Sequence, residues 1–274
     1  MTPSAARICI ITPGHLASAP RVVKEANALT EAGFQVHVVS GRSFAPVDAA
    51  DEEIISASKW TSTRIDGNGP GSLLRKFRRK LARRKSASNP RLSVELAAWA
   101  IHADTGRLGR AAAKSDAHLY IGHCVPGLAA AAFAAGKRGC RYGFDAEDFH
   151  DAETLQVVNE PAILNAVRAI ESAFLPGCSH LTAASPLIGE EYAKVYGVKP
   201  LPILNVFPRD HAPREPFIPA PISSQRPAVL YWFSQTIGPG RGIEAIVDII
   251  RRMKTPAELQ LRGFASESYV EQLT

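Results

Sequence analysis

The chain has 274 residues, a formal net charge of +6, and the composition of an ordinary folded protein, with 46% hydrophobic and 21% charged residues. This length exceeds one small domain and falls short of two Rossmann-type domains of usual size. Every apolar run is well below the roughly 20 residues that cross a bilayer, so we expect no transmembrane helix.

The four cysteines, Cys9, Cys124, Cys140 and Cys178, lie far apart and form no Cys-x-x-Cys pair. We therefore expect buried thiols rather than a zinc site or a disulfide framework. The apolar run at residues 8–11 is too short for the core of a signal peptide, which predicts a cytoplasmic protein.

The first forty residues predict a strand, a helix and a second strand. Residues 7–12 form a β-branched run that stops at Pro13 and Gly14. A helical pattern over about 19–32 ends at Gly33, and residues 34–40 have the pattern of another buried strand. Two strands joined by a helix in this way form a parallel βαβ unit.

The same alternation continues along the chain. We expect strands at 117–122, 140–145, 180–184 and 201–204, and helices at 126–137, 160–175 and 185–196. This order predicts an α/β fold, with a Rossmann-like parallel sheet that carries helices on both faces.

A proline-rich stretch at 207–226 predicts an interdomain linker after a first domain at 1–206. A second Rossmann-like domain is expected to begin at 227 and to be partial at 274. Its expected elements are a strand at 228–233, a glycine-rich turn at 237–242, a helix to 254 and a strand at 258–262.

The turn after the first strand, at Gly14 and His15, is a candidate binding element. Ligands of open α/β sheets bind at the carboxyl edge of the strands, where helix N-termini attract phosphate. Bound NAD is not expected, because the chain has no G-x-G-x-x-G motif and no acidic residue after the second strand. The alternative is that Gly14 only allows the chain to turn.

A dense group of titratable residues, Asp145, Glu147, Asp148 and His150, follows a buried strand, and His123 ends another. Such groups often lie in clefts and assist proton transfer. Asp145, Glu147, Asp148 and His123 are therefore the candidate catalytic residues. The alternatives are a solvated, helix-capping loop and a buried histidine with satisfied hydrogen bonds.

Several segments together resemble one known family, the family 4 glycosyltransferases of the two-domain GT-B type. They are residues 21–26 with 33–36, 120–123, 144–150, 183–186 with 196–197, and 205–206. Glu147 stands where many members carry a histidine. Arg21 is a further candidate at the site, with pairing to Glu25 one helical turn away as the alternative.

The resemblance implies that the first domain holds an acceptor and that the second binds a nucleotide-diphosphate sugar. Gly240, Arg241 and Gly242 match part of the family's donor diphosphate site, while Gln235 or Thr236 replaces a further cation. A guanidinium can stabilise the charge of a departing nucleoside diphosphate. Arg241 could instead be a solvent-facing residue at a helix start.

The activity implied is retaining transfer of a sugar to a glycan or lipid-linked acceptor, in polysaccharide or glycolipid synthesis. No metal and no cofactor other than the donor substrate are expected. The family holds its donor with two glutamates late in the second domain, beyond residue 274. We therefore expect this chain to bind the donor weakly and to turn over little or nothing.

Residues 73–85 form a strongly basic segment in which Leu73, Leu74, Phe77 and Leu81 share one face of a helix. Such a segment can lie on an anionic membrane surface, which would place the protein on the inner face of the membrane. The alternative is a solvated helix whose apolar residues pack on the domain. Nucleic-acid binding is disfavoured, because no aromatic platform accompanies the cations.

Two other functions stay open. One is a non-catalytic interaction or membrane-associated module on the same scaffold, and the other is a sugar-nucleotide epimerase of the same architecture. A first domain alone discriminates poorly between them, because one fold hosts many functions.

Overall fold

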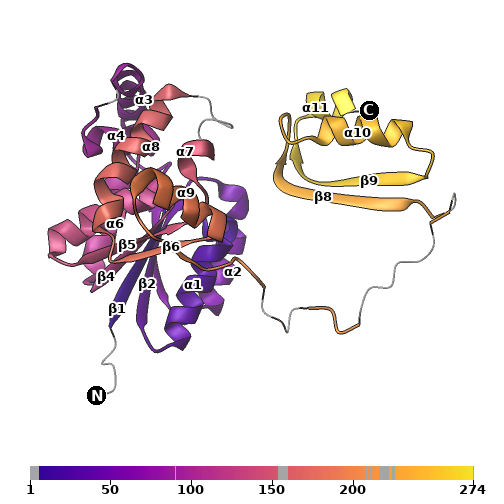
Figure 1. Ribbon diagram of the computed structural model, residues 1–274. Coiled ribbons are helices and arrows are strands. Elements are labelled where there is room, and N and C mark those ends of the chain that lie inside the picture. The colour runs from indigo at the N-terminus through magenta and orange to yellow at the C-terminus, as the bar shows by residue number, and fades with distance from the viewer. Residues whose placement is uncertain are drawn as a thin grey trace. The chain divides into compact units, whose positions relative to one another are not determined.

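The computed structural model describes residues 6–89, 91–153, 160–207, 209, 212–215, 222–223 and 226–273. Contacts divide the chain into two compact units, Met1–Val206 and Phe207–Thr274 (Figure 1). Several residues of the predicted linker lie outside the described residues.

The first unit is built on a parallel sheet of seven described strands in the order β3-β2-β1-β4-β5-β6-β7. The strands are β1 (Arg7–Thr12), β2 (Gln35–Arg42), β3 (Thr61–Asp66), β4 (Leu119–His123), β5 (Arg141–Ala146), β6 (His180–Ala183) and β7 (Leu201–Pro202). The strand order reverses direction between β1 and β4. Open α/β sheets bind ligands at such a switch point.

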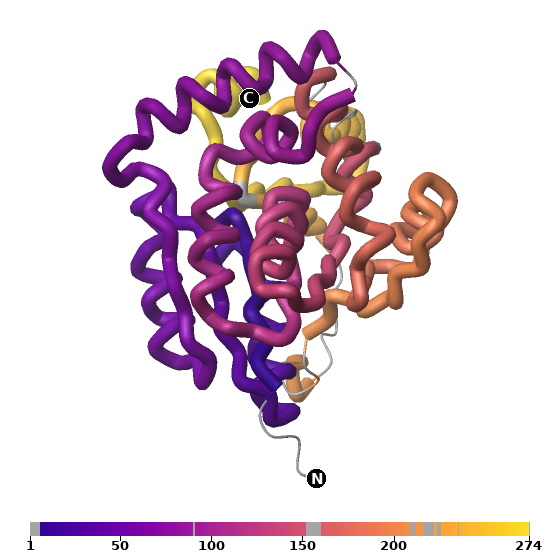
Figure 2. The backbone as a smooth tube through the Cα atoms, turned by 90° about the vertical axis from the view of Figure 1, so that its left-hand side faces the viewer, coloured from indigo at the N-terminus to yellow at the C-terminus, as the bar shows by residue number. Residues whose placement is uncertain are grey.

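Helices cover both faces of this sheet (Figures 1 and 2). They are α1 (Pro20–Glu31), α2 (Asp48–Ala57), α3 (Ser72–Ser88), α4 (Val94–Ile101), α5 (Thr105–Ala112), α6 (Cys124–Arg138), α7 (His150–Glu153), α8 (Pro161–Phe174) and α9 (Pro186–Tyr196). Strand β1 shows the two-sided burial directly. Ile8 and Ile10 pack with residues of α1, while Cys9 and Ile11 pack with residues of α5 and α6.

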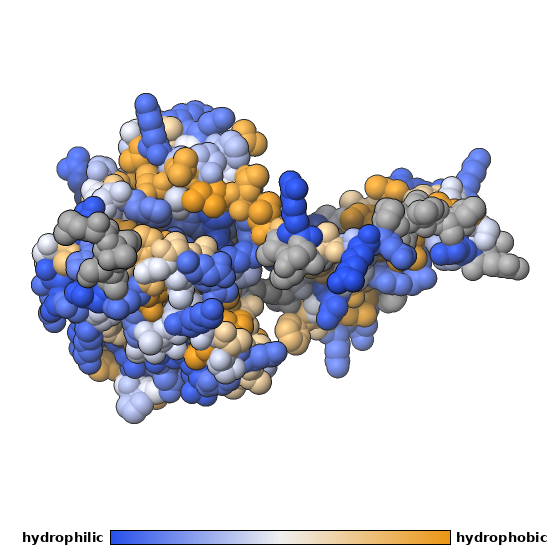
Figure 3. Space-filling model, turned by 90° about the horizontal axis from the view of Figure 1, so that it is seen from below, coloured by the Kyte–Doolittle hydropathy of each residue, from blue (hydrophilic) through white to orange (hydrophobic). Residues whose placement is uncertain are grey.

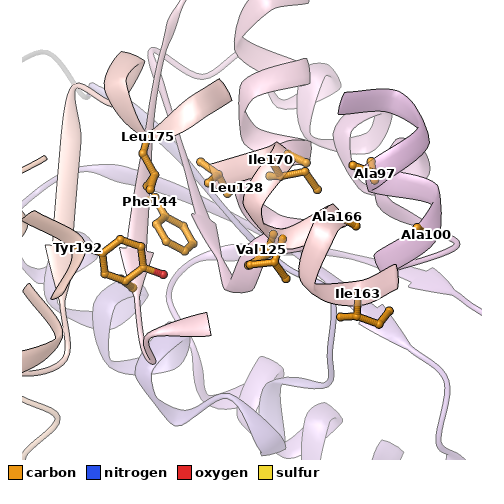
Figure 4. Packing of buried hydrophobic residues seen from close by; sticks show 14 of the residues in the cluster. Ala97, Ala100, Val125, Leu128, Phe144, Ile163, Ala166, Ile170, Leu175 and Tyr192 are labelled. Atoms are coloured by element: carbon orange, nitrogen blue, oxygen red, sulfur yellow. The ribbon is translucent and has the colours of Figure 1, made fainter. Parts of the chain in front are cut away.

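The largest core cluster lies between the sheet and the layer of α4, α6 and α8 (Figure 4). Within this cluster, Phe144 of β5 contacts Tyr192 of α9 edge to face, with 6.4 Å between ring centroids. Small residues such as Ala97 and Ala166 let the helices approach closely. This packing fixes the carboxyl end of β5, where several candidate residues lie.

Two glycines set the distance between α6 and the sheet. A Cβ atom at Gly122 of β4 would lie 2.3 Å from the carbonyl carbon of Gly127, and one at Gly127 would lie 2.7 Å from the carbonyl oxygen of Ile11. No side chain fits in either place. The first turn of α6 therefore lies directly against β1 and β4, at the switch point.

The second unit contains β8 (Ala228–Ile237), α10 (Ile243–Arg252), β9 (Ala257–Ala265) and α11 (Glu267–Leu273). Strands β8 and β9 are parallel and α10 connects them. Val229, Tyr231 and Phe233 of β8 are exposed. Apolar side chains reach the surface of both units (Figure 3).

The predicted fold class, a Rossmann-like parallel sheet with helices on both faces, is confirmed, and a second parallel sheet, β8-β9, is present in the second unit. Some boundaries were wrong. Strand β8 runs to Ile237, so the glycine-rich turn begins at Gly238, and β7 is shorter than predicted. Helices α2, α4 and α5 and strand β3 were not predicted.

The expectation of buried thiols holds only for Cys9. Cys124, Cys140 and Cys178 are half-buried because they lie where strands and helices begin or end. Among the described helices, none combines the length and the apolar character needed to cross a bilayer.

Candidate functional site

The carboxyl ends of three adjacent strands bring the predicted site segments to one edge of the first sheet. In register, Ile11 of β1 lies beside Gly122 of β4, and His123 lies beside Asp145 of β5. The turn at Gly14 and the loop at Asp148 follow directly after these strands. The edge they share includes the switch point between β1 and β4.

His123 is the centre of this edge and is fully buried. Its Nδ1 lies 2.8 Å from Glu147 Oε1 and its Nε2 lies 2.6 Å from Glu25 Oε2. Asp145 Oδ2 is 3.5 Å away. Burial lowers the pKa of His123, but its hydrogen bonds to Glu147 and Glu25 outweigh burial and raise the pKa to about 10. The imidazole is therefore an imidazolium that donates from both nitrogens at neutral pH.

Arg21 of α1 holds Asp145 through two hydrogen bonds. Its Nη2 donates to Asp145 Oδ1 at 2.7 Å, its Nε donates to the second carboxylate oxygen, and Thr182 also donates to Asp145. Burial raises the pKa of Asp145, but Arg21, His123 and Thr182 together bring it below its usual value. The alternative pairing of Arg21 with Glu25 was wrong, because both side chains reach instead to the sheet edge.

The buried network contains two cations, Arg21 and His123, and three carboxylates, Glu25, Asp145 and Glu147. Buried carboxylates are stable only when cations and hydrogen bonds compensate for lost solvation. The positive and negative charges of the network are thus nearly equal in number, with one carboxylate in excess. Glu25 and Glu147 are the more exposed carboxylates of the three.

A cavity of about 380 Å³ adjoins this network, between α1 and the segment that follows β7. Arg21, Glu25 and Asp145 line its polar side, and Leu29 and Leu204 contribute apolar surface. Lys24 Nζ donates to Asn205 Oδ1 and to the carbonyl of Val206, each at 2.9 Å. The cavity therefore offers carboxylates beside an apolar wall.

The turn at Gly14 and His15 is held by contacts within the protein. His15 is buried, its Nδ1 lies 2.7 Å from Asp51 Oδ2, and its Nε2 accepts hydrogen bonds from the backbone N–H groups of Ser43 and Phe44. The Gly14 carbonyl accepts from the N–H of Gly41. Both ring nitrogens of His15 are engaged, so the side chain fixes the turn against β2 and α2.

Two groups of His and carboxylate atoms among the described residues lie close enough to share an ion: His15 with Asp48 and Asp51, and His123 with Asp145 and Glu147. In each group an arginine already faces the carboxylates. Arg64 lies 3.6 Å from Asp51, and Arg21 binds Asp145. In both groups, hydrogen bonds and the charge of the arginine compensate the negative charge of the carboxylates.

The remaining members of the predicted cluster lie apart from the His123 network. Asp148 is exposed, and its backbone carbonyl oxygen lies 3.3 Å from the hydroxyl oxygen of Tyr192. His150 is buried, with Nδ1 2.9 Å from the Tyr192 hydroxyl, which donates to Glu171 at 2.6 Å. His150 thus belongs to a polar group within the core.

In the second unit, Arg241 lies over the end of β8. Its Nη1 is 3.1 Å from Ser234 Oγ and its Nη2 is 3.5 Å from Thr236 Oγ1. Gly240 and Gly242 have φ values of 78° and 76°, in the region that favours glycine. Arg241 is exposed, lies just before α10 begins, and donates to two hydroxyls of β8. The side chain of Gln235 is outside the described residues.

No family model and no curated protein sequence matches this chain. Solved structures match it at low identity. Sucrose-phosphate synthase from Thermosynechococcus elongatus has a TM-score of 0.62 at 15% identity, over 96% of this chain and 63% of the synthase. A putative UDP-N-acetylglucosamine 2-epimerase from Listeria monocytogenes has a TM-score of 0.55 at 11% identity, over 98% of this chain and 66% of the epimerase. The chain has the fold of the GT-B glycosyltransferases.

A third GT-B match is Arabidopsis thaliana UGT89C1 in complex with UDP-L-rhamnose, with a TM-score of 0.54 at 11% identity, over 97% of this chain and 71% of that protein. The chain spans slightly less than two thirds of the synthase and the epimerase.

Several site residues in this GT-B fold were not predicted from the sequence. Glu25, Thr182 and Asp51 carry central hydrogen bonds of the two networks. Arg21 was a candidate from the sequence, whereas Glu25 entered only as its possible partner one helical turn away. Thr182 lies within the strand predicted at 180–184, but it was not singled out as a site residue.

Proposed function

We propose that this chain is part of a retaining glycosyltransferase. It transfers a sugar from a nucleotide-diphosphate donor to a hydroxyl of a glycan or lipid-linked acceptor, in the synthesis of a polysaccharide or glycolipid. The first unit holds the acceptor, and the second binds the donor. The GT-B fold supports this proposal, since UGT89C1 was solved with UDP-L-rhamnose and the matched synthase forms a sugar phosphate.

The observation that carries the proposal is the buried network around His123, beside a cavity between α1 and the segment that follows β7. A core needs no such group of ionised side chains, and shifted pKa values with specific charge partners are typical of functional sites. Carboxylates accept hydrogen bonds from sugar hydroxyls. Glu147, with Glu25 and the exposed Asp148, supplies carboxylates that an acceptor can reach.

The roles within this network differ. A general base works best with a pKa near the operating pH, and a histidine whose pKa is about 10 is already protonated. We assign His123 a positioning role, in which its charge orients Glu25 and Glu147. Asp145, held by Arg21 and Thr182, anchors the network.

On the donor side, we assign Arg241 to the diphosphate, next to Gly240 and Gly242. The leaving nucleoside diphosphate gains negative charge as the sugar departs, and a guanidinium fixed before the reaction stabilises that charge. The N-terminus of α10, which begins at Ile243, adds backbone N–H groups of the same polarity.

Ligand-observed NMR of the 274-residue chain with a panel of nucleotide sugars tests the proposal. We expect weak, saturable binding, with a Kd on the order of 1 mM, that free nucleoside diphosphate competes away. Arg241→Ala should weaken it roughly tenfold, while Arg252→Ala, at the far end of the helix that follows Arg241, should leave it unchanged. A panel in which no nucleotide or nucleotide sugar binds would overturn the proposal.

A sugar-nucleotide epimerase is the second candidate, because one matched structure is a putative epimerase that aligns with 98% of this chain. Product analysis separates the two activities. A transferase releases free nucleoside diphosphate only when an acceptor is present, whereas an epimerase changes the donor sugar without any acceptor.

A further inference from the structure

Helix α3 lies at the upper end of the first unit and packs on it through one face (Figures 1 and 2). Ala82 and Ser86 are buried, and the Arg83 Nε donates to the carbonyl of Ala100 at 3.1 Å. Asn165 of α8 donates to the Ser86 carbonyl at 2.9 Å. Positions separated by three or four residues therefore attach α3 to α4 and α8.

The large apolar side chains of α3 lie on the opposite face. Leu73, Leu74, Phe77 and Leu81 are 81%, 55%, 64% and 46% exposed. The alternative that these residues pack on the domain was wrong. Small residues and the stems of arginines occupy the packed face instead, which leaves the apolar stripe in solvent.

Cations flank the stripe on both sides. Lys76 and Lys80 lie on one side, Arg78 and Lys85 lie on the other, and Arg84 is exposed among the apolar residues. Helix α3 contains no acidic residue.

Next to α3, Arg107 and Arg110 of α5 join Arg75 and Arg78 around a cavity of about 330 Å³. Asp104 pairs with Arg75 and Arg107 at 2.8 Å each, and Trp99 lies under the Arg78 guanidinium. The cavity keeps an excess of positive charge after these contacts. The basic surface therefore extends beyond the helix itself.

We propose that α3 docks the protein onto an anionic lipid bilayer. The helix lies in the plane of the interface, with Leu73, Leu74, Phe77 and Leu81 inserted among the acyl chains and the flanking cations at the phosphate groups. An apolar stripe bordered by cations complements a hydrocarbon layer bordered by anionic headgroups. A nucleic acid would use the cations and leave the four apolar side chains in water. This surface is independent of the sugar-transfer proposal.

Co-sedimentation of the full chain with vesicles tests the proposal. Vesicles of phosphatidylcholine with about one third phosphatidylglycerol should bind the protein at least about tenfold more strongly than phosphatidylcholine alone, and added salt should weaken this binding. A variant with Leu73, Leu74, Phe77 and Leu81 all changed to Ser should bind about tenfold less at low salt. Lys76→Gln with Lys80→Gln and Arg84→Gln should lose most of the salt-sensitive binding.

Matched control variants test whether vesicle binding depends on α3 itself or on any exposed apolar residue or positive charge of the protein. Leu187→Ser with Val195→Ser removes exposed apolar residues from α9, and Lys114→Gln with Lys137→Gln removes exposed charge elsewhere. Both should bind vesicles like the unchanged protein. Circular dichroism should show that all variants fold, because the changed side chains are exposed.

Three results would overturn the proposal. They are equal binding to neutral and anionic vesicles, unchanged binding by the folded four-serine variant, and binding to duplex DNA without binding to vesicles.

Discussion

The imidazolium of His123 donates a hydrogen bond from Nε2 to Glu25 Oε2 across 2.6 Å, and so connects the carboxyl end of β4 to helix α1. The two residues are 98 positions apart. Their contact exists only after β4 has paired with β1 and α1 has packed on the sheet. The candidate site and the folded core therefore form together.

Replacing His123 with Gln should destabilise the first unit by about 3 kcal/mol. Glutamine can keep hydrogen bonds but not the charge, so Glu25, Asp145 and Glu147 would repel one another inside the protein. Urea unfolding at pH 7 measures the change. His118→Gln, at an exposed histidine, should have little effect, and equal stability of the two variants would contradict this account.

The pH dependence of the free energy of unfolding should follow the titration of His123. The pKa of His123 is about 10 in the folded protein and near 6.5 when unfolded, so its charge stabilises the fold fully below pH 6.5. This contribution is lost as the pH rises from 6.5 to about 10. The urea midpoint should fall over that range, and should fall less in His123→Gln. Parallel curves for the two proteins would show that another group is responsible.

Changing Arg21 to Lys should destabilise the protein by about 2 kcal/mol, although the charge is kept. Lysine cannot donate to both oxygens of Asp145 and also to the carbonyl of Ile203, as Arg21 does. Hydrogen exchange at the amide of Ile203, which donates to Ala183, should become faster. Arg42→Lys is the control, because its paired contact with Asp48 is solvent-exposed and should change stability little.

Two glycines of α6 should respond in opposite directions to alanine. Gly127→Ala places a methyl group 2.7 Å from the Ile11 carbonyl oxygen and should cost at least about 2 kcal/mol. A Cβ atom at Gly136 would have no neighbour within 4 Å, so Gly136→Ala should raise stability by up to about 1 kcal/mol. Thermal unfolding compares the two, and a stable Gly127→Ala protein would disprove the close contact.

The elements that the sequence predicted well are those whose buried residues recur locally. Strand β1, α1 and β2 carry apolar residues with strand and helix periodicity, and both faces of β1 are buried. Strand β3, with the sequence TSTRID, lies at the sheet edge, and none of its residues is fully buried. Helix α2 has four acidic residues and three alanines among its ten residues. Neither segment has the apolar period that sequence analysis detects.

The sequence by itself determined the α/β alternation, the strand-end positions of Gly14, His123 and Asp145, and the basic apolar helix at 73–85, because each depends on residues near one another in the chain. Tertiary structure alone decided the partners. Arg21 binds Asp145 from 124 residues away, His15 is enclosed by Asp51 and the end of β2, and the leucines of α3 face solvent. These contacts and exposures depend on which faces of the helices and strands pack together. That packing is decided only in the folded protein, where buried charges pair with opposite charges and small residues allow close contact.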